Sequence, residues 1–235
     1  RLGALVLVCF VALQLTFAAR IALMRVLDPQ STTFQRSEMW RLLGETGRIE
    51  WSQQWVDYGQ ISPHLKRAVI ASEDASFADH SGVDWDSIEK AWERNQRAEV
   101  RAELRAERQA DRPKAAPSRR AEPKVVGGST ISQQLAKNLF LSGERTVLRK
   151  GQEFVITMLL ETLLSKQRIL EIYLNSVEWG EGLFGAQAAA RHYFRIDAAR
   201  LGPEAAARLA VMLPAPKRFE KRPASAYVTG RAATI

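Results

Sequence analysis

The sequence predicts a mainly α-helical protein with one apolar segment at its N-terminus, and three observations support this fold class. Apolar residues recur at helical spacing from Pro63 onward, and from Thr130 the pattern is helical almost throughout. No segment combines the length, alternation and turn residues typical of a β-strand. Residues 2–19 carry no charge. A chain of 235 residues has room for one domain and an anchor, or for two small lobes.

The N-terminal apolar run predicts a transmembrane anchor. It continues past Arg20 through residues 21–24, which makes it long enough to cross the hydrocarbon core of a bilayer. A cleaved signal peptide is the alternative, because Phe17-Ala18-Ala19 resembles a cleavage site. We favour an uncleaved anchor, because the run is longer than a typical signal-peptide core. We therefore assign residues 1–27 to an anchor and a juxtamembrane segment.

Charge and cysteine content restrict the function classes. The net charge of +8 and the isoelectric point near 9.9 favour anionic partners such as phospholipid, nucleic acid or a diphosphate. The sequence contains a single cysteine, Cys9, which lies in the apolar run. One cysteine cannot form a disulfide framework or a cysteine metal site. The three histidines (His64, His80 and His192) lack metal-ligand spacing, so a zinc enzyme is not expected.

We predict a folded domain over residues 28–235, interrupted at residues 95–124 by a charged, low-complexity insert. The insert contains nine basic and five acidic residues, and Val100 and Leu104 are its only sizeable apolar side chains. Like charges recur every four residues, which mildly destabilises a helix, and little apolar surface is available for burial. We expect a frayed helix followed by a mobile linker.

The other helices follow from apolar stripes and from breaker residues. Pro63 suits the first turn of a helix that ends near residues 72–77. Further helical stripes follow Thr130, and three glycines at 180, 182 and 185 interrupt them. The helical pattern resumes over residues 186–194 and 203–213.

The first polar segment that carries chemistry is the acid-rich helix end at residues 72–84. Glu73 is our candidate general base, because a carboxylate in a helical groove can accept the proton of an attacking hydroxyl. Partial burial, or the charge of the adjacent Asp74, would raise the pKa of Glu73. We expect His80 to make structural hydrogen bonds and Phe77 to anchor the packing.

The second polar segment is the glycine turn and helix start at residues 127–138. Thr130 and Gln133 fit a capping box, so a helix should begin at or near Thr130 and present backbone N–H groups to an anion. Either Gln133 or Gln134 can share a helix face with Lys137. The candidate substrate-binding residues of these two segments are Asp74, Ser129, Thr130, Gln133, Gln134, Lys137 and Asn138.

Both segments resemble the first two motifs of the peptidoglycan glycosyltransferases (glycosyltransferase family 51). The first motif, Glu-Asp-x-x-Phe-x-x-His-x-Gly-x-Asp, is filled by Glu73, Asp74, Phe77, His80, Gly82 and Asp84. The second, Gly-Gly-Ser-Thr-Ile-x-Gln-Gln-x-x-Lys-Asn, is filled by residues 127–138. Membrane-anchored members with a single catalytic domain are the nearest match. The resemblance implies a lysozyme-like glycosyltransferase lobe beside a smaller membrane-facing lobe, and it implies that Glu73 deprotonates the acceptor 4-hydroxyl.

Further motifs extend the resemblance to residues 63–94 and 125–223. Arg149, Lys150 and Glu153 resemble the third motif, Arg-Lys-x-x-Glu, and their spacing lets all three share one helix face. Together with Arg145, these cations can neutralise a departing diphosphate. The resemblance makes Glu153 the second essential carboxylate, which orients the donor directly or through Mg²⁺ or Mn²⁺. Residues 169–194 and 209–216 resemble the fourth and fifth motifs, and we assign both mainly to the core.

Together with the apolar N-terminal run, the resemblance implies a single-pass enzyme of the bacterial inner membrane whose catalytic domain is periplasmic. We expect it to polymerise lipid II into β-1,4-linked peptidoglycan strands, with inversion at the anomeric carbon and release of undecaprenyl diphosphate. The expected partners are lipid II, the growing glycan strand, membrane phospholipid and other proteins of cell-wall synthesis or division.

Three alternatives remain. A lysozyme-like hydrolase would also use one glutamate, but glycan cleavage has no diphosphate for the cations to bind. A membrane-tethered cell-wall scaffold with an inactive site is disfavoured by the intact Glu73 and Glu153. Nucleic-acid binding is not expected, because the most basic segment lacks interleaved aromatic residues and a recognisable module.

Overall fold

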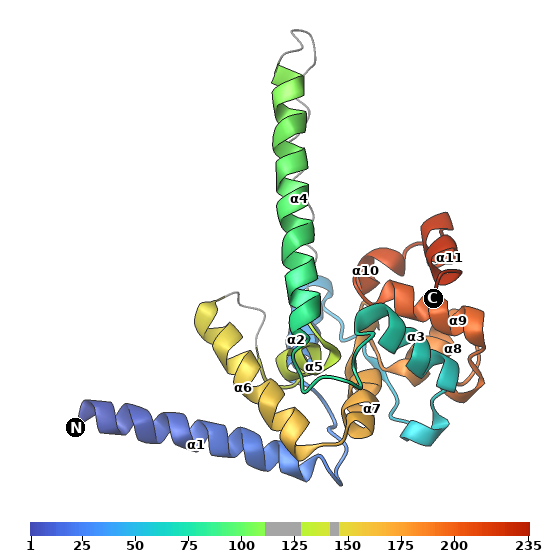
Figure 1. Ribbon diagram of the computed structural model, residues 1–235. Helices are drawn as coiled ribbons and strands as arrows, with labels where there is room; N and C mark the ends of the chain where they lie inside the picture. The colour runs from blue at the N-terminus through green and yellow to red at the C-terminus, as the bar shows by residue number, and fades with distance from the viewer. Residues whose placement is uncertain (111–127, 142–145) are drawn as a thin grey trace. The chain divides into compact units, whose positions relative to one another are not determined.

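The computed structural model describes residues 1–110, 128–141 and 146–235, and this part of the chain is mainly α-helical, as predicted (Figure 1). It forms two compact units: residues 1–82 with 130–235, and residues 83–129. The helices of the larger unit are α1 (Leu2–Leu23), α2 (Thr33–Thr46), α3 (Pro63–Glu73), α5 (Ile131–Phe140), α6 (Val147–Leu163), α7 (Lys166–Ser176), α8 (Ala186–Phe194), α9 (Pro203–Met212), α10 (Pro216–Phe219) and α11 (Ala226–Ala232). Two 3₁₀ helices, η1 (Tyr58–Gln60) and η2 (Ala198–Arg200), complete its helical elements.

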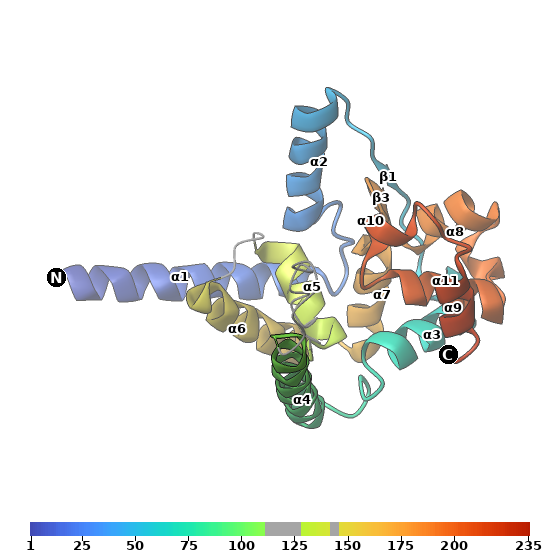
Figure 2. The same ribbon diagram turned by 90° about the horizontal axis from the view of Figure 1, so that it is seen from above.

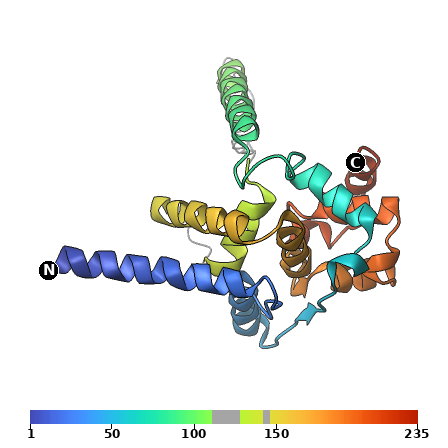
Figure 3. The same cartoon turned by 60° about the horizontal axis from the view of Figure 1, so that its bottom comes forward.

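Helix α1 is the one helix of the described residues that is long and apolar enough to cross a membrane. Its C-terminal half contacts α6, as Figure 3 shows. Gln14 of α1 and Gln152 of α6 exchange two amide hydrogen bonds of 3.0 and 2.9 Å. The prediction of an N-terminal transmembrane segment is thus supported by a continuous helix over the expected residues.

The segment that follows α1 is tied to α7 by one arginine. The Nε group of Arg168 donates to the carbonyl oxygen of Met24 at 2.7 Å, and its Nη2 group lies 2.8 Å from Asp28 Oδ1. Nearby, Arg25 Nε donates to the carbonyl oxygen of Leu163 at 2.6 Å. These bonds fix the point at which the chain leaves α1 and enters the rest of the larger unit.

A small sheet is the feature that the sequence analysis missed. Its strands are β1 (Ser52–Gln53), β2 (Glu178–Gly180) and β3 (Leu183–Phe184), in the order β1-β3-β2. Strand β1 runs parallel to β3, and β2 runs antiparallel to it. Strands of two or three residues are too short to show alternation, so the hydrophobic pattern did not indicate them. Gly182 closes the β2–β3 turn with a φ of +68°, where an added Cβ would lie 2.2 Å from the carbonyl oxygen of Glu50.

Two helical groups form the core of the larger unit (Figure 2). In one group, α3 and α11 pack on α9; in the other, α5 packs on α6 and α7. Trp179, Tyr173 and Phe184 are the largest fully buried side chains among the described residues. This packing brings the C-terminal end of α3 and the N-terminal end of α5 together, which matters for the site below. The predicted division into a lysozyme-like lobe and a membrane-facing lobe stays a prediction.

The smaller unit contains α4 (Trp85–Ala110). Asp84 caps this helix, because its carboxylate accepts hydrogen bonds from Ser87 N at 2.8 Å and Ser87 Oγ at 2.6 Å. The predicted insert at residues 95–124 therefore begins inside a helix that starts ten residues earlier. Residues 111–124, where the sequence predicted a linker, lie outside the described residues.

Candidate active site

Glu73 is the last residue of α3 and is half-buried. Its Oε2 atom accepts a hydrogen bond of 3.0 Å from Gln134 Nε2. Within the described part of the chain, Oε1 has no hydrogen-bond partner, so this oxygen can receive a proton. Burial is the largest influence and raises the pKa of Glu73, the hydrogen bond from Gln134 lowers it, and the charge of Asp74 raises it further. Both causes that the sequence suggested for a raised pKa are present.

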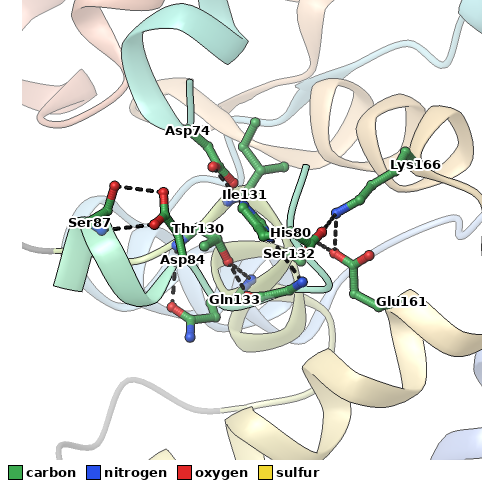
Figure 4. Close-up of polar contacts among 11 residues, drawn as sticks. Asp74, His80, Asp84, Ser87, Thr130, Ile131, Ser132, Gln133, Glu161 and Lys166 are labelled. Atoms are coloured by element: carbon green, nitrogen blue, oxygen red, sulfur yellow. Dashed lines mark hydrogen bonds and ion pairs between the residues drawn. The ribbon is translucent and has the colours of Figure 1, made fainter. Parts of the chain in front are cut away.

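Asp74 follows Glu73 in the sequence and is buried, and Figure 4 shows its carboxylate beside Ile131 and His80. Its Oδ2 atom accepts a bond of 2.9 Å from the backbone N–H of Ile131, and its Oδ1 atom lies 2.9 Å from His80 Nε2. His80 Nδ1 accepts a bond of 3.0 Å from the N–H of Gly82, so the ring proton sits on Nε2 and is donated to Asp74. The expected structural role of His80 is confirmed.

Gly82 fixes the loop that follows these residues and places it against the start of helix α5. Its φ of +90° suits glycine, and an added Cβ would lie 2.7 Å from Thr157 Cγ2. Its carbonyl oxygen accepts a hydrogen bond of 2.7 Å from Thr130 Oγ1. The first motif is therefore held against the start of α5 by both its side chains and its backbone.

The start of α5 confirms one prediction and corrects another. Thr130 and Gln133 form the expected capping box, and the helix begins at Ile131. However, the N–H of Ile131 already donates to Asp74, and the N–H of Gln133 already donates to Thr130 Oγ1. Thr130 is 2% exposed and Gln133 is 6% exposed. The expectation of an open anion cradle at this helix start was wrong, because a buried carboxylate of the protein itself occupies it.

The remaining candidates of the second motif lie in different environments. Gln134 points to Glu73, whereas Lys137, one turn further along α5, is exposed. Asn138 is buried at 8% exposure. Ser129 is exposed and belongs to the smaller unit. Arg145, which the sequence suggested as a diphosphate ligand, lies outside the described residues.

The third motif forms a charged triad on α6. Arg149 Nη1 donates to Glu153 Oε2 at 3.0 Å, and Lys150 Nζ donates to Glu153 Oε1. Glu153 is 4% exposed, whereas Lys150 is exposed. The predicted shared face is confirmed, and the triad carries a net charge of +1. Arg149 also has a buried Nε–H without a hydrogen-bond partner among the described residues.

The donor set near Glu153 limits how a metal could bind. The described residues contain no group of three or more His, Cys, Asp or Glu side chains that could hold a metal ion. Mg²⁺ commonly binds through one or two carboxylates together with phosphate oxygens and water. A single carboxylate that is already paired with two cations fits Mg²⁺ or Mn²⁺ only when a diphosphate supplies most of the ligands.

Three further polar residues hold the first motif in place, and the sequence analysis did not identify them (Figure 4). Lys166 Nζ donates to the carbonyl oxygen of His80 at 2.6 Å and to Glu161 Oε1 at 2.9 Å. Ser132 Oγ donates to the same carboxylate oxygen of Glu161. The sequence carries no local signal for this cluster, because its members come from α5, α6 and α7.

The chain is similar to known proteins over nearly its full length. The sequence model of the family described as transglycosylase matches residues 41–103 and 114–235. This match is wider than the resemblance predicted above, because it begins at residue 41 and includes most of the predicted insert.

The relatives of the chain include three proteins that carry the name biosynthetic peptidoglycan transglycosylase. The protein from Burkholderia orbicola is 50% identical over 227 residues, which cover 96% of this chain and 83% of the relative. The protein from Burkholderia multivorans is 49% identical, with coverage of 99% and 86%. The protein from Paraburkholderia phytofirmans is 47% identical, with coverage of 100% and 88%.

Proposed function

The chain belongs to the transglycosylase family and is a peptidoglycan glycosyltransferase, and we propose that it polymerises lipid II into β-1,4-linked glycan strands. The observation that carries this proposal is the setting of Glu73. The carboxylate is half-buried with a raised pKa, one oxygen is held by Gln134, and the other has no partner among the described residues. A general base for a sugar hydroxyl requires this combination of geometry and basicity.

The reaction step balances with Glu73 as base. The acceptor 4-hydroxyl oxygen forms a bond to the anomeric carbon of the donor, and its proton passes to Glu73 Oε1. The bond between that carbon and the diphosphate oxygen breaks, and its electron pair leaves with undecaprenyl diphosphate. Attack opposite an α-linked diphosphate gives the β-linkage, so no covalent intermediate between sugar and enzyme is required.

We assign the departing diphosphate to Lys137, Arg149 and Lys150, because these side chains provide the positive charge. Glu153 would then hold Arg149 and Lys150 in position, which agrees with the two ion pairs that it forms. Arg145 stays a prediction for the same role. If Mg²⁺ or Mn²⁺ takes part, Glu153 would be the residue that holds it, and the ion would supply additional positive charge for the departing diphosphate.

Membrane attachment supports a lipid-linked substrate. We propose that residues 1–27 provide an uncleaved anchor in the bacterial inner membrane and that residues 28–235 form the periplasmic catalytic domain. The basic net charge favours contact with phospholipid headgroups and with the diphosphate of lipid II. Contacts with other proteins of cell-wall synthesis or division stay a prediction.

The decisive test is polymerisation of purified lipid II by the detergent-solubilised full chain. We compare the wild type with Glu73→Gln and with Glu204→Gln, an exposed control on α9. We expect glycan strands from the wild type and the control, and a rate about 10²–10⁴-fold lower for Glu73→Gln. Parallel reactions with Mg²⁺, Mn²⁺ or a chelator test whether polymerisation requires a divalent metal ion.

Two results would contradict the proposal. A wild-type protein that binds lipid II but forms no polymer would favour the scaffold. Cleavage of preformed glycan without polymerisation would favour the lysozyme-like hydrolase.

A further inference from the structure

Tyr173 of α7 lies behind the candidate base and does not face solvent. Its side chain is fully buried, and its hydroxyl group lies 3.0 Å from Gln134 Oε1. The same amide donates from Nε2 to Glu73 Oε2 at 3.0 Å. A continuous chain of two hydrogen bonds therefore runs from α7 through α5 to the end of α3.

We propose that Tyr173 is a positioning residue that holds the Gln134 amide in the orientation required by the ionised Glu73. This inference rests on the proposed function, because it assigns a role within the same reaction. Tyr173 does not contact substrate in this proposal and acts only through Gln134.

The direction of each hydrogen bond follows from the groups involved. An ionised carboxylate only accepts, so Gln134 must present its NH₂ group to Glu73 and its carbonyl oxygen to Tyr173. Tyr173 must then donate. Burial, followed by the charges of Glu73 and Asp74, holds the pKa of Tyr173 well above its usual value, so the hydroxyl keeps its proton.

The hydroxyl also disfavours the opposite amide orientation. With the amide reversed, its carbonyl oxygen would face the Glu73 carboxylate, and two acceptors would oppose each other. Among the described residues, the Tyr173 hydroxyl is the one donor to the Gln134 carbonyl oxygen. If the hydroxyl is removed, this oxygen has no donor in the productive orientation. Loss of the hydroxyl therefore weakens the hydrogen bond that lowers the pKa of Glu73.

The test is the pH dependence of lipid II polymerisation by the full chain. The base acts when ionised, so the rate rises with pH along an acidic limb and reaches a plateau. We expect Tyr173→Phe to displace this limb to higher pH. When each profile is divided by its own plateau rate, the variant's rate on the limb should be about threefold to tenfold lower than that of the wild type. A merely structural role would lower the whole profile without displacing the limb.

A matched control and a double-mutant cycle sharpen the test. Tyr193→Phe removes the same group from a half-buried tyrosine, whose hydroxyl donates to the carbonyl oxygen of Trp179 at 2.8 Å, and we expect no displacement. Gln134→Leu should displace the limb at least as far as Tyr173→Phe. The double variant should match Gln134→Leu alone, because Tyr173 acts through Gln134.

Three results would overturn the inference: an undisplaced limb in Tyr173→Phe, an equal displacement in Tyr193→Phe, or additive displacements in the double variant. If Tyr173→Phe does not fold, 3-fluorotyrosine at position 173 replaces it, because fluorination makes the hydroxyl a stronger donor. The limb should then move to lower pH, and an unmoved limb overturns the inference. Absence of polymer from the wild type would instead contradict the proposed function.

Discussion

A buried carboxylate away from the proposed reaction makes the stability of this protein depend on pH. Glu178 lies on β2, and its side chain is 8% exposed. Its nearest cation, Lys217, lies 3.6 Å from Oε1 and donates its hydrogen bond to Glu38 instead. Burial is the largest influence and raises the pKa of Glu178 to about 7; Lys217 lowers this pKa, and the charges of Glu38 and Glu220 raise it by less than Lys217 lowers it.

The sign and size of the effect follow from this shift. Below the usual pKa of 4.5, Glu178 is protonated in both the folded and the unfolded chain, and it has no pH-dependent effect. Between pH 4.5 and 7 the folded chain holds a proton that the unfolded chain has lost, so the free energy of unfolding falls as pH rises. Above pH 7 the loss is complete, on the order of 3 kcal/mol.

We therefore expect Glu178→Gln to stabilise the protein at pH 8 and to leave it nearly unchanged at pH 4.5. The assay is thermal unfolding of the detergent-solubilised chain followed by tryptophan fluorescence. Trp179 is a suitable reporter, because it is fully buried and donates to the carbonyl oxygen of Leu209 at 3.0 Å. A gain of this size corresponds to about 6–12 °C in melting temperature. Glu50→Gln, on an exposed loop, is the control and should have no such effect.

A lower melting temperature for Glu178→Gln at pH 8 would refute the reasoning. It would mean that attraction to Lys217 outweighs the cost of burying the Glu178 carboxylate. A gain of equal size at pH 4.5 would also refute it, because the benefit would then come from packing and not from the removal of a charge.

Three further predictions concern the candidate site. Gly82→Ala should lower the free energy of unfolding by about 1–3 kcal/mol, whereas Gly44→Ala, with open space around an added Cβ, should not; thermal unfolding compares them. Asp74→Asn should lower lipid II polymerisation while the fold persists, because a neutral amide accepts the hydrogen bond from the N–H of Ile131 less strongly than a carboxylate does. Unchanged activity would contradict the idea that Asp74 positions the start of α5. Arg149→Gln should destabilise the protein, but by less than the about 3–5 kcal/mol that an uncompensated buried charge costs, since Glu153 keeps its ion pair with Lys150; adding Glu153→Gln should restore stability but not polymerisation.

Local sequence patterns predicted the parts of the site that depend on local physics. The capping box of Thr130 and Gln133 needs only residues three apart, and α5 begins where the pattern placed it. The triad of Arg149, Lys150 and Glu153 likewise follows from the three- and four-residue spacing of a helix. The fold class was predictable for the same reason, because helical stripes are long, whereas the strands of the small sheet span two or three residues.

Contacts between distant segments were not predictable from such patterns. Asp74 and Ile131 are 57 residues apart, and the acid that closes the start of α5 belongs to the motif expected to face the substrate. Lys166 reaches the carbonyl oxygen of His80 across 86 residues. A free helix N-terminus and one neutralised by a remote carboxylate have the same local sequence, so a single sequence cannot distinguish them.

Tyr173 shows most clearly where the limit lies. Its position in an apolar stripe with Ile169 and Ile172 predicts burial, and all three side chains are fully buried. The stripe specifies which face of α7 packs inward but not which polar group the buried hydroxyl meets, since that depends on how α5 lies against α7. A buried hydroxyl must find a partner, and here the partner is the amide that holds Glu73. At a buried side chain with a polar end group, the sequence therefore predicts the burial but not the hydrogen-bond partner. The structure supplies that partner, and here it connects the core to the candidate catalytic carboxylate.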